Sequence, residues 1–209
     1  MRVGICGGTF DPFHRGHLDP ILSVRESMQW DRVVYIPAFI QPFKQDRETA
    51  PSHHRFAMTT LAIEEHDALY ADPRELERGS VSYTVETLRE LRKENPEATI
   101  DWIIGDDNLE KLHEWKNIDE IFALANFTVL TRAPILNPQS SILNPTCCVT
   151  DPSDRPKNGA MVYAHNPLTP VSSTEIRQRI REGNEIEDLV PARVSRYIQH
   201  YGLYRKGQS

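Results

Sequence analysis

Two histidines in a glycine-rich segment are the clearest candidates for chemistry in this chain. The segment spans residues 7–17 (GGTFDPFHRGH), between a short apolar run and a helical pattern. A turn from a strand into a helix presents free backbone N–H groups that can bind a phosphate. His14 and His17 lie on one face if the helix begins there, and both can stabilise charge on phosphoryl oxygens. A capped turn with surface histidines, or a metal site without an obvious third ligand, are the alternatives.

A second candidate for phosphate binding lies near the C-terminus, at residues 171–177 (VSSTEIR). Serine and threonine ahead of a glutamate and a periodic run are typical of a helix N-cap, which is a purely structural role. In the functional alternative, the hydroxyls of Ser172 and Ser173 bind a second phosphate together with the N-terminal amides. Arg177 would then add a positive charge one turn inside the helix.

Three further segments carry side chains suited to a nucleotide. Lys44 follows Gln41-Pro42-Phe43 in a polar loop, where it is either solvated or neutralises a polyphosphate. Tyr83 and Thr84 begin a predicted helix, and Trp115 further on offers a ring for stacking, although tryptophan also packs in cores. His53-His54 suggest a metal, but adjacent residues of a helix diverge by about 100°, so we expect surface positions.

Strand-like runs alternate with helical patterns along the chain. This rhythm predicts an α/β protein with a doubly wound, mostly parallel sheet and helices on both faces. Ligands of such sheets bind beyond the carboxyl ends of the strands, where both residues 7–17 and residues 105–107 (GDD) would lie. The expected strands are 2–6, 32–36, 68–71, 99–104, 127–131 and 161–164, and the expected helices are 16–29, 52–66, 82–94, 106–112, 117–125, 173–183 and 191–200.

The length of 209 residues suits a single domain, with a small helical part from about residue 173. Residues 133–160 interrupt the rhythm with five prolines, which predicts a surface loop or small insertion. A formal net charge of −6 argues against a general nucleic-acid binder, although a local pocket can still attract a small anion.

The cysteines and the hydropathy of the chain indicate in which cellular compartment the protein works. The three cysteines, Cys6, Cys147 and Cys148, form no disulfide framework, because the count is odd and adjacent cysteines pair poorly. We find neither a signal peptide pattern nor an apolar run of about 20 residues. We therefore expect a cytosolic protein with no membrane partner.

Together these segments resemble the bacterial nicotinate mononucleotide adenylyltransferases, which belong to the nucleotidyltransferase superfamily marked by an HxGH signature. The resemblance runs from Met1 to about Leu203, with 133–160 as an interruption. It rests on GGTFDPxHxGH, a loop lysine, SYT at 82–84, GxD at 105–107, Trp115 and SSTxIR at 172–177. It implies a Rossmann-like sheet and transfer of an adenylyl group from ATP to nicotinate mononucleotide, with Mg²⁺ assisting and pyrophosphate leaving.

The resemblance also implies a role for each matching residue. His14, His17, Lys44 and Arg177 would act on the phosphates, with His17 at the reacting centre. Tyr83, Thr84, Trp115 and Arg132 would bind the mononucleotide, Thr84 at the nicotinate carboxylate and Trp115 on the pyridine ring. The ATP-binding residues would be Gly8, Thr9, Phe10, Gly105, Asp106, Asp107, Ser172, Ser173 and Ile176.

Two departures bear on which base is selected rather than on the reaction. The family often has Pro-Pro-His-Lys where this chain has Gln41-Pro42-Phe43-Lys44, and Val81 stands where proline is frequent. The rival activities are a nicotinamide mononucleotide adenylyltransferase, a phosphopantetheine adenylyltransferase and a non-catalytic nucleotide-binding module. A metalloprotein using the four histidines named above is a further rival. The sequence leaves the oligomeric state open, with a homo-oligomer among the expected partners.

Overall fold

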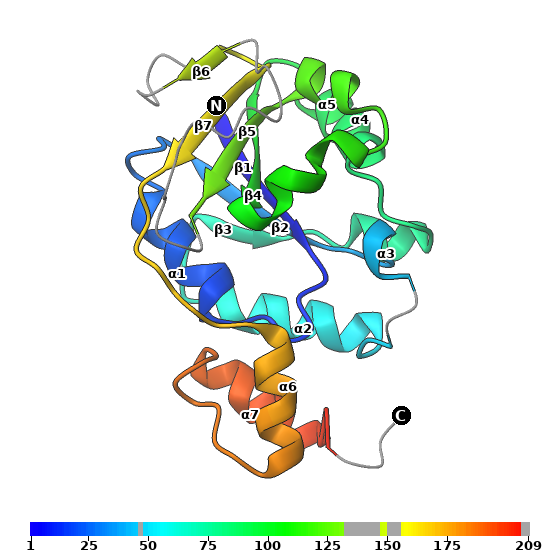
Figure 1. Ribbon diagram of the computed structural model, residues 1–209, viewed down its shortest axis with the longest axis vertical. Coiled ribbons are helices and arrows are strands. Elements are labelled where there is room, and N and C mark those ends of the chain that lie inside the picture. Colours follow the sequence, from blue (N-terminus) through cyan, green and yellow to red (C-terminus); the bar gives the residue numbers. More distant parts are fainter. Residues whose placement is uncertain (46–47, 132–146, 150–155, 206–209) are drawn as a thin grey trace.

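The computed structural model describes residues 1–45, 48–131, 147–149 and 156–205, built around a seven-stranded sheet (Figure 1). Every pair of neighbouring strands is parallel. The order across the sheet is β3-β2-β1-β4-β5-β7-β6. The strands are β1 (Arg2–Gly8), β2 (Arg32–Pro37), β3 (Leu69–Ala71), β4 (Thr99–Gly105), β5 (Asn126–Leu130), β6 (Cys147–Val149) and β7 (Ala160–Ala164).

The winding of the sheet reverses between β1 and β4. From β1 the chain passes outward to β2 and β3, then returns to β4 on the other side of β1 and continues to β5 and β7. The structure thus confirms the predicted doubly wound sheet. The adjoining carboxyl ends of β1 and β4 form the topological switch point, where such sheets bind their ligands.

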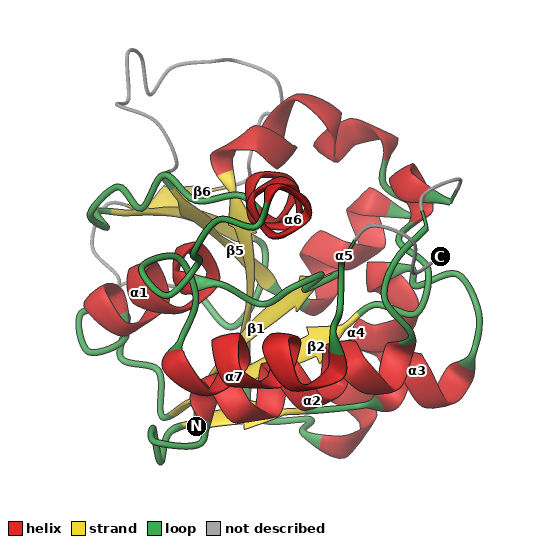
Figure 2. Ribbon diagram, turned by 90° about the horizontal axis from the view of Figure 1, so that it is seen from below, coloured by secondary structure: helices red, strands yellow, loops and turns green. Residues whose placement is uncertain are grey.

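Helices cover both faces of the sheet (Figures 1 and 2). One hydrophobic cluster includes residues of α1, α2, α6 and α7, and the other includes residues of α4 and α5. The helical elements are α1 (Arg15–Val24), η1 (Pro42–Lys44), α2 (Ser52–Ile63), α3 (Arg74–Arg78), α4 (Thr84–Glu94), η2 (Asp106–Glu114), α5 (Ile118–Leu124), α6 (Ser173–Glu182) and α7 (Ala192–Tyr201); η1 and η2 are 3₁₀ helices.

Strand β2 shows how the sequence produces these two faces. Val33 and Tyr35 pack into the first cluster, whereas Val34 and Ile36 pack into the second. Successive side chains of a strand point to opposite faces, so a central parallel strand has to be apolar throughout. In α4, Val85, Leu88 and Leu91 are all buried, as the predicted stripe requires.

The C-terminal helices share the core of the sheet. Ile176 of α6 and Val194 and Ile198 of α7 belong to the same cluster as Leu18 and Ile21 of α1. Figure 2 shows α7 lying beside α2, in agreement with the contacts between the two helices.

Several predicted elements differ from the observed ones. The helix expected at 16–29 ends at Val24, where the Ser27 hydroxyl donates to the Val24 carbonyl and competes with a further helical turn. The sequence did not predict α3 or η1, which are too short for a periodic signal. The expected loop at 133–160 contains β6, which pairs with β7 at the sheet edge. Residues 133–146 and 150–155 of that segment lie outside the described residues.

Cys6 is in no disulfide with a described residue, and the side chains of Cys147 and Cys148 lie outside what the structure describes. Within the described ranges, no helix is both long enough and apolar enough to span a bilayer.

Candidate active site

A cleft of about 1000 Å³ opens at the switch point of the sheet. Its floor is formed by the ends of β1 and β4, from Cys6 to Gly8 and from Trp102 to Gly105. Ala38 after β2 and Leu130 and Thr131 at the end of β5 extend the wall. The two predicted loops, 7–17 and 105–107, therefore contribute to one cleft.

An aromatic floor supports the turn between β1 and α1. The rings of Phe10 and Phe13 are buried, and each meets the ring of Tyr35, at centroid distances of 5.8 and 5.1 Å. Phe10 also meets His17 edge-on at 5.0 Å. Phe10 has a φ of 51°, a left-handed conformation that costs a side-chain-bearing residue energy. Packing therefore holds this turn in a shape that its local preference would not select.

The two histidines lie against each other at the start of α1. Their rings stack at a centroid distance of 3.7 Å, and His14 is buried while His17 is half-buried. The His14 amide donates to Nδ1 of His17 at 3.3 Å, and the Tyr35 hydroxyl donates to the His17 carbonyl at 3.0 Å. A neutral ring that accepts at Nδ1 carries its proton on Nε2. The neutral His17 ring, which lines the cleft, is thus a hydrogen-bond donor at Nε2.

Gly16, between the two histidines, is required by this close packing. A Cβ atom at Gly16 would lie 3.0 Å from Nδ1 of His14 and 3.2 Å from the Val171 carbonyl oxygen. Both distances are tighter than ordinary van der Waals contact, so any side chain would push the His14 ring or the chain ahead of α6 away.

The start of α6 is joined to the β1–α1 turn. Ser172 is the N-cap of α6, and its hydroxyl accepts from the Glu175 amide at 3.2 Å, which is the structural role predicted for it. The Ser173 hydroxyl donates to the Pro12 carbonyl at 3.1 Å. Arg177 donates to the Asp11 carbonyl at 2.6 Å. The two phosphate-type segments, which are far apart in the sequence, therefore lie side by side, and both line the cleft.

Asp11 is a site residue that the sequence analysis did not single out. Its buried carboxylate accepts from the Tyr204 hydroxyl at 2.7 Å and from the Ala50 amide at 3.1 Å, and it lies 3.6 Å from the Arg177 guanidinium. Burial, and next the Asp11 charge, raise the pKa of Tyr204 well above its usual range, so its hydroxyl stays a donor. The contact links the C-terminal residues to the cleft.

Arg55 of α2 is a second residue that the sequence analysis missed. Its side chain is 1% exposed and donates to the carbonyls of Thr9, Ala38, Phe39 and Ala50. These carbonyls belong to the loops that follow β1 and β2, so one guanidinium holds both loops together beneath the cleft. Burial lowers the pKa of Arg55. A single arginine near the start of a helix gives no sequence signal for such a role.

The opposite end of the cleft is built by α4 and η2. Tyr83 is the N-cap of α4 and Thr84 is its first residue, and both line the cleft with Trp115 at the end of η2. The Trp115 ring meets Phe127 edge-on at 6.0 Å, and Nζ of Lys116 lies 4.1 Å above the Tyr83 ring. Free N–H groups at the start of α4 favour an anion, and the Trp115 ring offers an aromatic surface beside them.

Most of the remaining predicted residues line the cleft, and Ile176 does not. Gly8, Thr9, Phe10, Gly105 and Asp107 line the cleft. Ile176, predicted for ATP binding, is fully buried in the core and does not line it, because it is the apolar contact of α6 with the sheet.

Asp106, next to Asp107, does not line the cleft either. Arg132 lies outside the described residues, and so does the side chain of Lys44, of which only the backbone within η1 is described.

The histidines predicted at the surface of α2 differ from each other. His53 is exposed, but His54 is half-buried, and its Nδ1 lies 2.9 Å from the Tyr197 hydroxyl of α7. Burial, and next His53, lower the pKa of His54. Among the residues that the structure describes, no group of three or more His, Cys, Asp or Glu side chains could hold a metal ion.

Comparisons with known proteins agree with this geometry. Residues 5–179 match the family described as cytidylyltransferase-like. A probable nicotinate-nucleotide adenylyltransferase of Desulfatibacillum aliphaticivorans is 35% identical, over 98% of this chain and 100% of the relative. A probable nicotinate-nucleotide adenylyltransferase of Halalkalibacterium halodurans is 36% identical, over 100% of this chain and 93% of the relative.

Solved structures share the fold. The nicotinic acid mononucleotide adenylyltransferase of Plasmodium falciparum complexed with NaAD has a TM-score of 0.73 at 20% identity, over 97% of both chains. The same protein complexed with APC has a TM-score of 0.75 at 18% identity, over 97% of this chain and 96% of the other.

Proposed function

The chain belongs to the cytidylyltransferase-like family and, within it, to the nicotinate-nucleotide adenylyltransferases, and from this premise we propose its reaction. A 5′-phosphate oxygen of nicotinate mononucleotide attacks the α-phosphorus of ATP. The bond from that phosphorus to the oxygen bridging the α- and β-phosphates breaks, and pyrophosphate leaves. The other product is nicotinate adenine dinucleotide, so the enzyme serves NAD biosynthesis.

The observation that carries the proposal is the meeting of the histidine pair with the start of α6 at the switch point. Two helix N-termini, the His17 ring and the Arg177 guanidinium supply donors and positive charge along one side of the cleft. Phosphoryl-type transfer needs positioning and charge stabilisation more than covalent chemistry. A direct in-line displacement therefore suits this site.

We assign the ATP half of the cleft to the residues around β1 and α6. The backbone of Gly8, Thr9 and Phe10 approaches the nucleotide, and His14 and His17 contact the phosphates. His17, with Nε2–H as the donor, acts at the reacting centre. The polyphosphate is bound by Lys44, Ser172, Ser173 and Arg177, and the adenosine lies by Gly105 and Asp107, with Asp106 close by.

We assign the other half of the cleft to the mononucleotide. The first amides of α4, at Thr84, receive the nicotinate carboxylate, and Trp115 stacks on the pyridine ring. Tyr83 and Arg132 are the further residues that we assign to mononucleotide binding.

The enzyme is a nucleotidyltransferase, a class that generally works with a divalent metal, and we propose that this ion is Mg²⁺. Mg²⁺ usually binds through substrate phosphates and water and takes few protein ligands. The described residues offer no three-residue ligand group, and the Asp11 carboxylate already accepts from Tyr204 and Ala50. We therefore treat the metal as part of the substrate, Mg·ATP, which neutralises the triphosphate when bound.

We further propose that residues 1–209 act as one nucleotidyltransferase domain in the cytosol. The shared core of the C-terminal helices and the sheet supports the single domain. Assembly into a homo-oligomer stays a prediction, as does the absence of nucleic-acid and membrane partners.

Pyrophosphate release tests the reaction. Purified protein is mixed with Mg²⁺ and ATP, with and without nicotinate mononucleotide, and pyrophosphate and the dinucleotide are quantified. We expect stoichiometric formation of both products only when both substrates are present. Binding of both nucleotides without pyrophosphate release would instead support the non-catalytic module. Turnover with phosphopantetheine but not with the mononucleotide would support that rival enzyme.

A further inference from the structure

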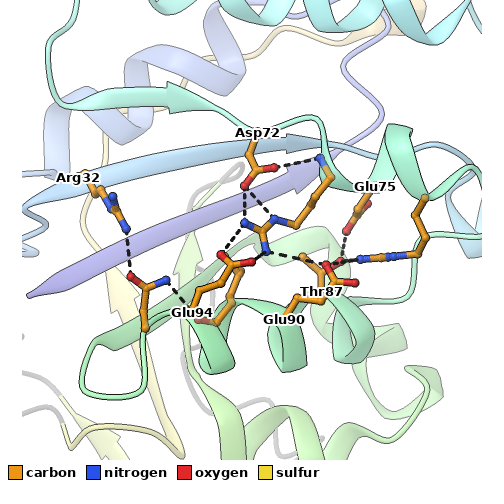
Figure 3. Close-up of polar contacts among 10 residues, drawn as sticks. Arg32, Asp72, Glu75, Thr87, Glu90 and Glu94 are labelled. Carbon is orange, nitrogen blue, oxygen red and sulfur yellow. Dashed lines mark hydrogen bonds and ion pairs between the residues drawn. The ribbon is translucent and has the colours of Figure 1, made fainter.

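Glu75 is a buried carboxyl group at the mononucleotide end of the cleft. It belongs to the short helix α3 (Figure 3). Its side chain is 4% exposed and contributes to the cleft wall. A carboxyl group is rarely so buried unless its partners offset the lost hydration. The partners of Glu75 therefore indicate what it does.

Two hydroxyl groups are the hydrogen-bond partners of this carboxyl. Thr87 Oγ1 of α4 donates to Glu75 Oε1 at 2.5 Å, and the Ser82 hydroxyl is close enough to the same carboxyl to lower its pKa. The nearest arginine, Arg78, donates instead to Thr87 Oγ1 and pairs with Glu90 at 2.9 Å. Burial raises the pKa of Glu75, and the two hydroxyl contacts oppose that rise.

Ser82 joins two loops of the cleft. Its hydroxyl oxygen accepts from the Phe39 amide at 2.9 Å, and its own amide donates to the Ile40 carbonyl at 2.9 Å. Ile40 and Val81 form an isolated parallel bridge at the same place. The Phe39 amide occupies a lone pair of the Ser82 oxygen, so the Ser82 hydroxyl proton remains available to the Glu75 carboxyl, on which it acts. Glu75 therefore fixes the orientation of the group that joins the loop after β2 to the start of α4.

Holding α3 against α4 does not by itself require a buried carboxylate. Arg74 already bridges the two helices to Glu94 at 3.0 Å and to Glu90 at 3.8 Å, and Arg78 adds its own pair with Glu90 (Figure 3). The carboxylates of these ion pairs are partly exposed to solvent, because the side chains of Glu90 and Glu94 are 43% and 54% exposed. The buried contacts of Glu75 instead point toward Ser82, which directly precedes Tyr83 and Thr84.

We propose that Glu75 is a positioning residue for the mononucleotide: through Ser82 it sets the first amide of α4, at Thr84, for the substrate carboxylate. The inference rests on the proposed function. It goes beyond it by adding a residue that does not touch the substrate but determines how well the acid is bound. A displacement of about 1 Å at a binding group is enough to weaken a reaction strongly.

Four substitutions distinguish a positioning role of Glu75 from a purely structural role in holding α3 against α4. Glu75→Gln keeps the shape but presents an amide N–H to one of the two hydroxyls. Ser82→Ala removes the joining hydroxyl, and Thr87→Val removes only the contact within the α3–α4 pair. Glu77→Gln on the same short helix is exposed and serves as the matched control. For each variant, KM for nicotinate mononucleotide, KM for ATP, kcat and Tm are measured.

We expect Glu75→Gln and Ser82→Ala to raise KM for nicotinate mononucleotide about tenfold, the size of one lost hydrogen bond to a charged group. KM for ATP should stay unchanged in both. Thr87→Val should lower Tm and leave both KM values as they are, and Glu77→Gln should change nothing. If Glu75→Gln does not fold, Ser82→Ala, which removes a single oxygen atom, carries the test.

Equal increases in both KM values in Glu75→Gln and Ser82→Ala would overturn the inference in favour of a purely structural role. The same increase in KM for the mononucleotide in Thr87→Val would overturn it as well. A lowered Tm with unchanged KM in Glu75→Gln and Ser82→Ala would also overturn it. Failure of the wild-type protein to use the mononucleotide at all would instead remove the proposed function, and this inference with it.

Discussion

The two histidines of the β1–α1 turn differ in burial, and this difference separates their roles. His14 is buried beneath the turn and donates its amide to His17, so it fixes the ring of its neighbour. His17 faces the cleft with Nε2–H as a donor. A donor that is already oriented stabilises transition-state charge without reorganisation at the moment of reaction.

Replacement of His17 by alanine should therefore lower kcat by about 10²–10³-fold, the usual cost of one lost transition-state donor. Tm should change little, because the ring is only half-buried. Pyrophosphate release and a thermal melt check both expectations. His53→Ala, at an exposed histidine, is the control; near-full activity in His17→Ala would show that the assigned role is wrong.

Arg55 is the single residue on which the loops beneath the cleft depend most. Arg55→Met should lower the free energy of unfolding by more than about 2 kcal/mol, because it leaves buried carbonyl oxygens without a donor. Denaturant unfolding measures the loss. Arg89→Met, which removes an exposed ion pair with Glu120, should have little effect. Similar stability of the two variants would contradict the account of Arg55.

At the scale of elements, glycines end the helices that frame the cleft. Gly79 after α3 and Gly183 after α6 have φ values of 65° and 79°, and a Cβ atom at either would meet nothing within 4 Å. The reason for glycine there is backbone conformation, because the left-handed region is unfavourable for residues with a side chain.

We accordingly expect Gly183→Ala to destabilise the protein by about 1 kcal/mol even though the space is open. The free energy of unfolding in denaturant measures the change. Gln178→Ala on the exposed surface of α6 is the control and should be close to neutral. Unchanged stability in Gly183→Ala would mean that α6 can end without this conformation.

The contact between α3 and α4 predicts a dependence of stability on pH. Burial raises the pKa of Glu75 above its ordinary value, so the folded protein holds this proton more tightly than the unfolded chain. The stability that the protonated group contributes is fully present below the unfolded pKa and is lost as pH rises through the folded pKa.

On acidification from pH 7 to pH 4.5, the wild-type protein should thus gain stability relative to Glu75→Gln, whose amide does not titrate. Thermal melts of both proteins across that range measure the difference in Tm. Parallel curves, or a difference that changes in the opposite direction, would contradict this assignment.

The strands and long helices could be predicted from the sequence because their apolar patterns are local. The alternation that buries both sides of β2 and the stripe of α4 are visible in short windows of residues. The five residues of α3 carry no such period, so Glu75 was not recognised as a buried group. Strand β6 escaped prediction for the same reason, because it is a three-residue edge strand.

At the scale of the whole molecule, the cleft depends on contacts between distant parts of the chain. The hydrogen bond from Tyr204 to Asp11 joins residues 193 positions apart, and Arg177 reaches back 166 positions to the Asp11 carbonyl. Sequence motifs identified the segments that meet at the switch point. They could not identify Asp11, Tyr204 or Arg55 as the residues that hold those segments, because such partners have no fixed spacing.

The C-terminal contact predicts a remote effect on the ATP half of the cleft. Tyr204→Phe removes one donor from the buried Asp11 carboxylate and loosens the loop to which Arg177 binds. We expect a several-fold rise in KM for ATP, of about the size of one hydrogen bond to a charged group, with KM for the mononucleotide unchanged. Steady-state kinetics measure both constants. Tyr201→Phe, at a half-exposed tyrosine of α7, should behave as wild type, and an equal effect in the two variants would contradict the proposed link.

A comparison of two mononucleotides as substrates tests the central claim most directly. The protein is assayed with Mg²⁺ and ATP, with nicotinate mononucleotide and its amide counterpart side by side, and kcat/KM is determined for each. Because the amides at the start of α4 favour an anionic group, the account predicts a clearly higher kcat/KM for the acid. An equal or reversed ratio would contradict it.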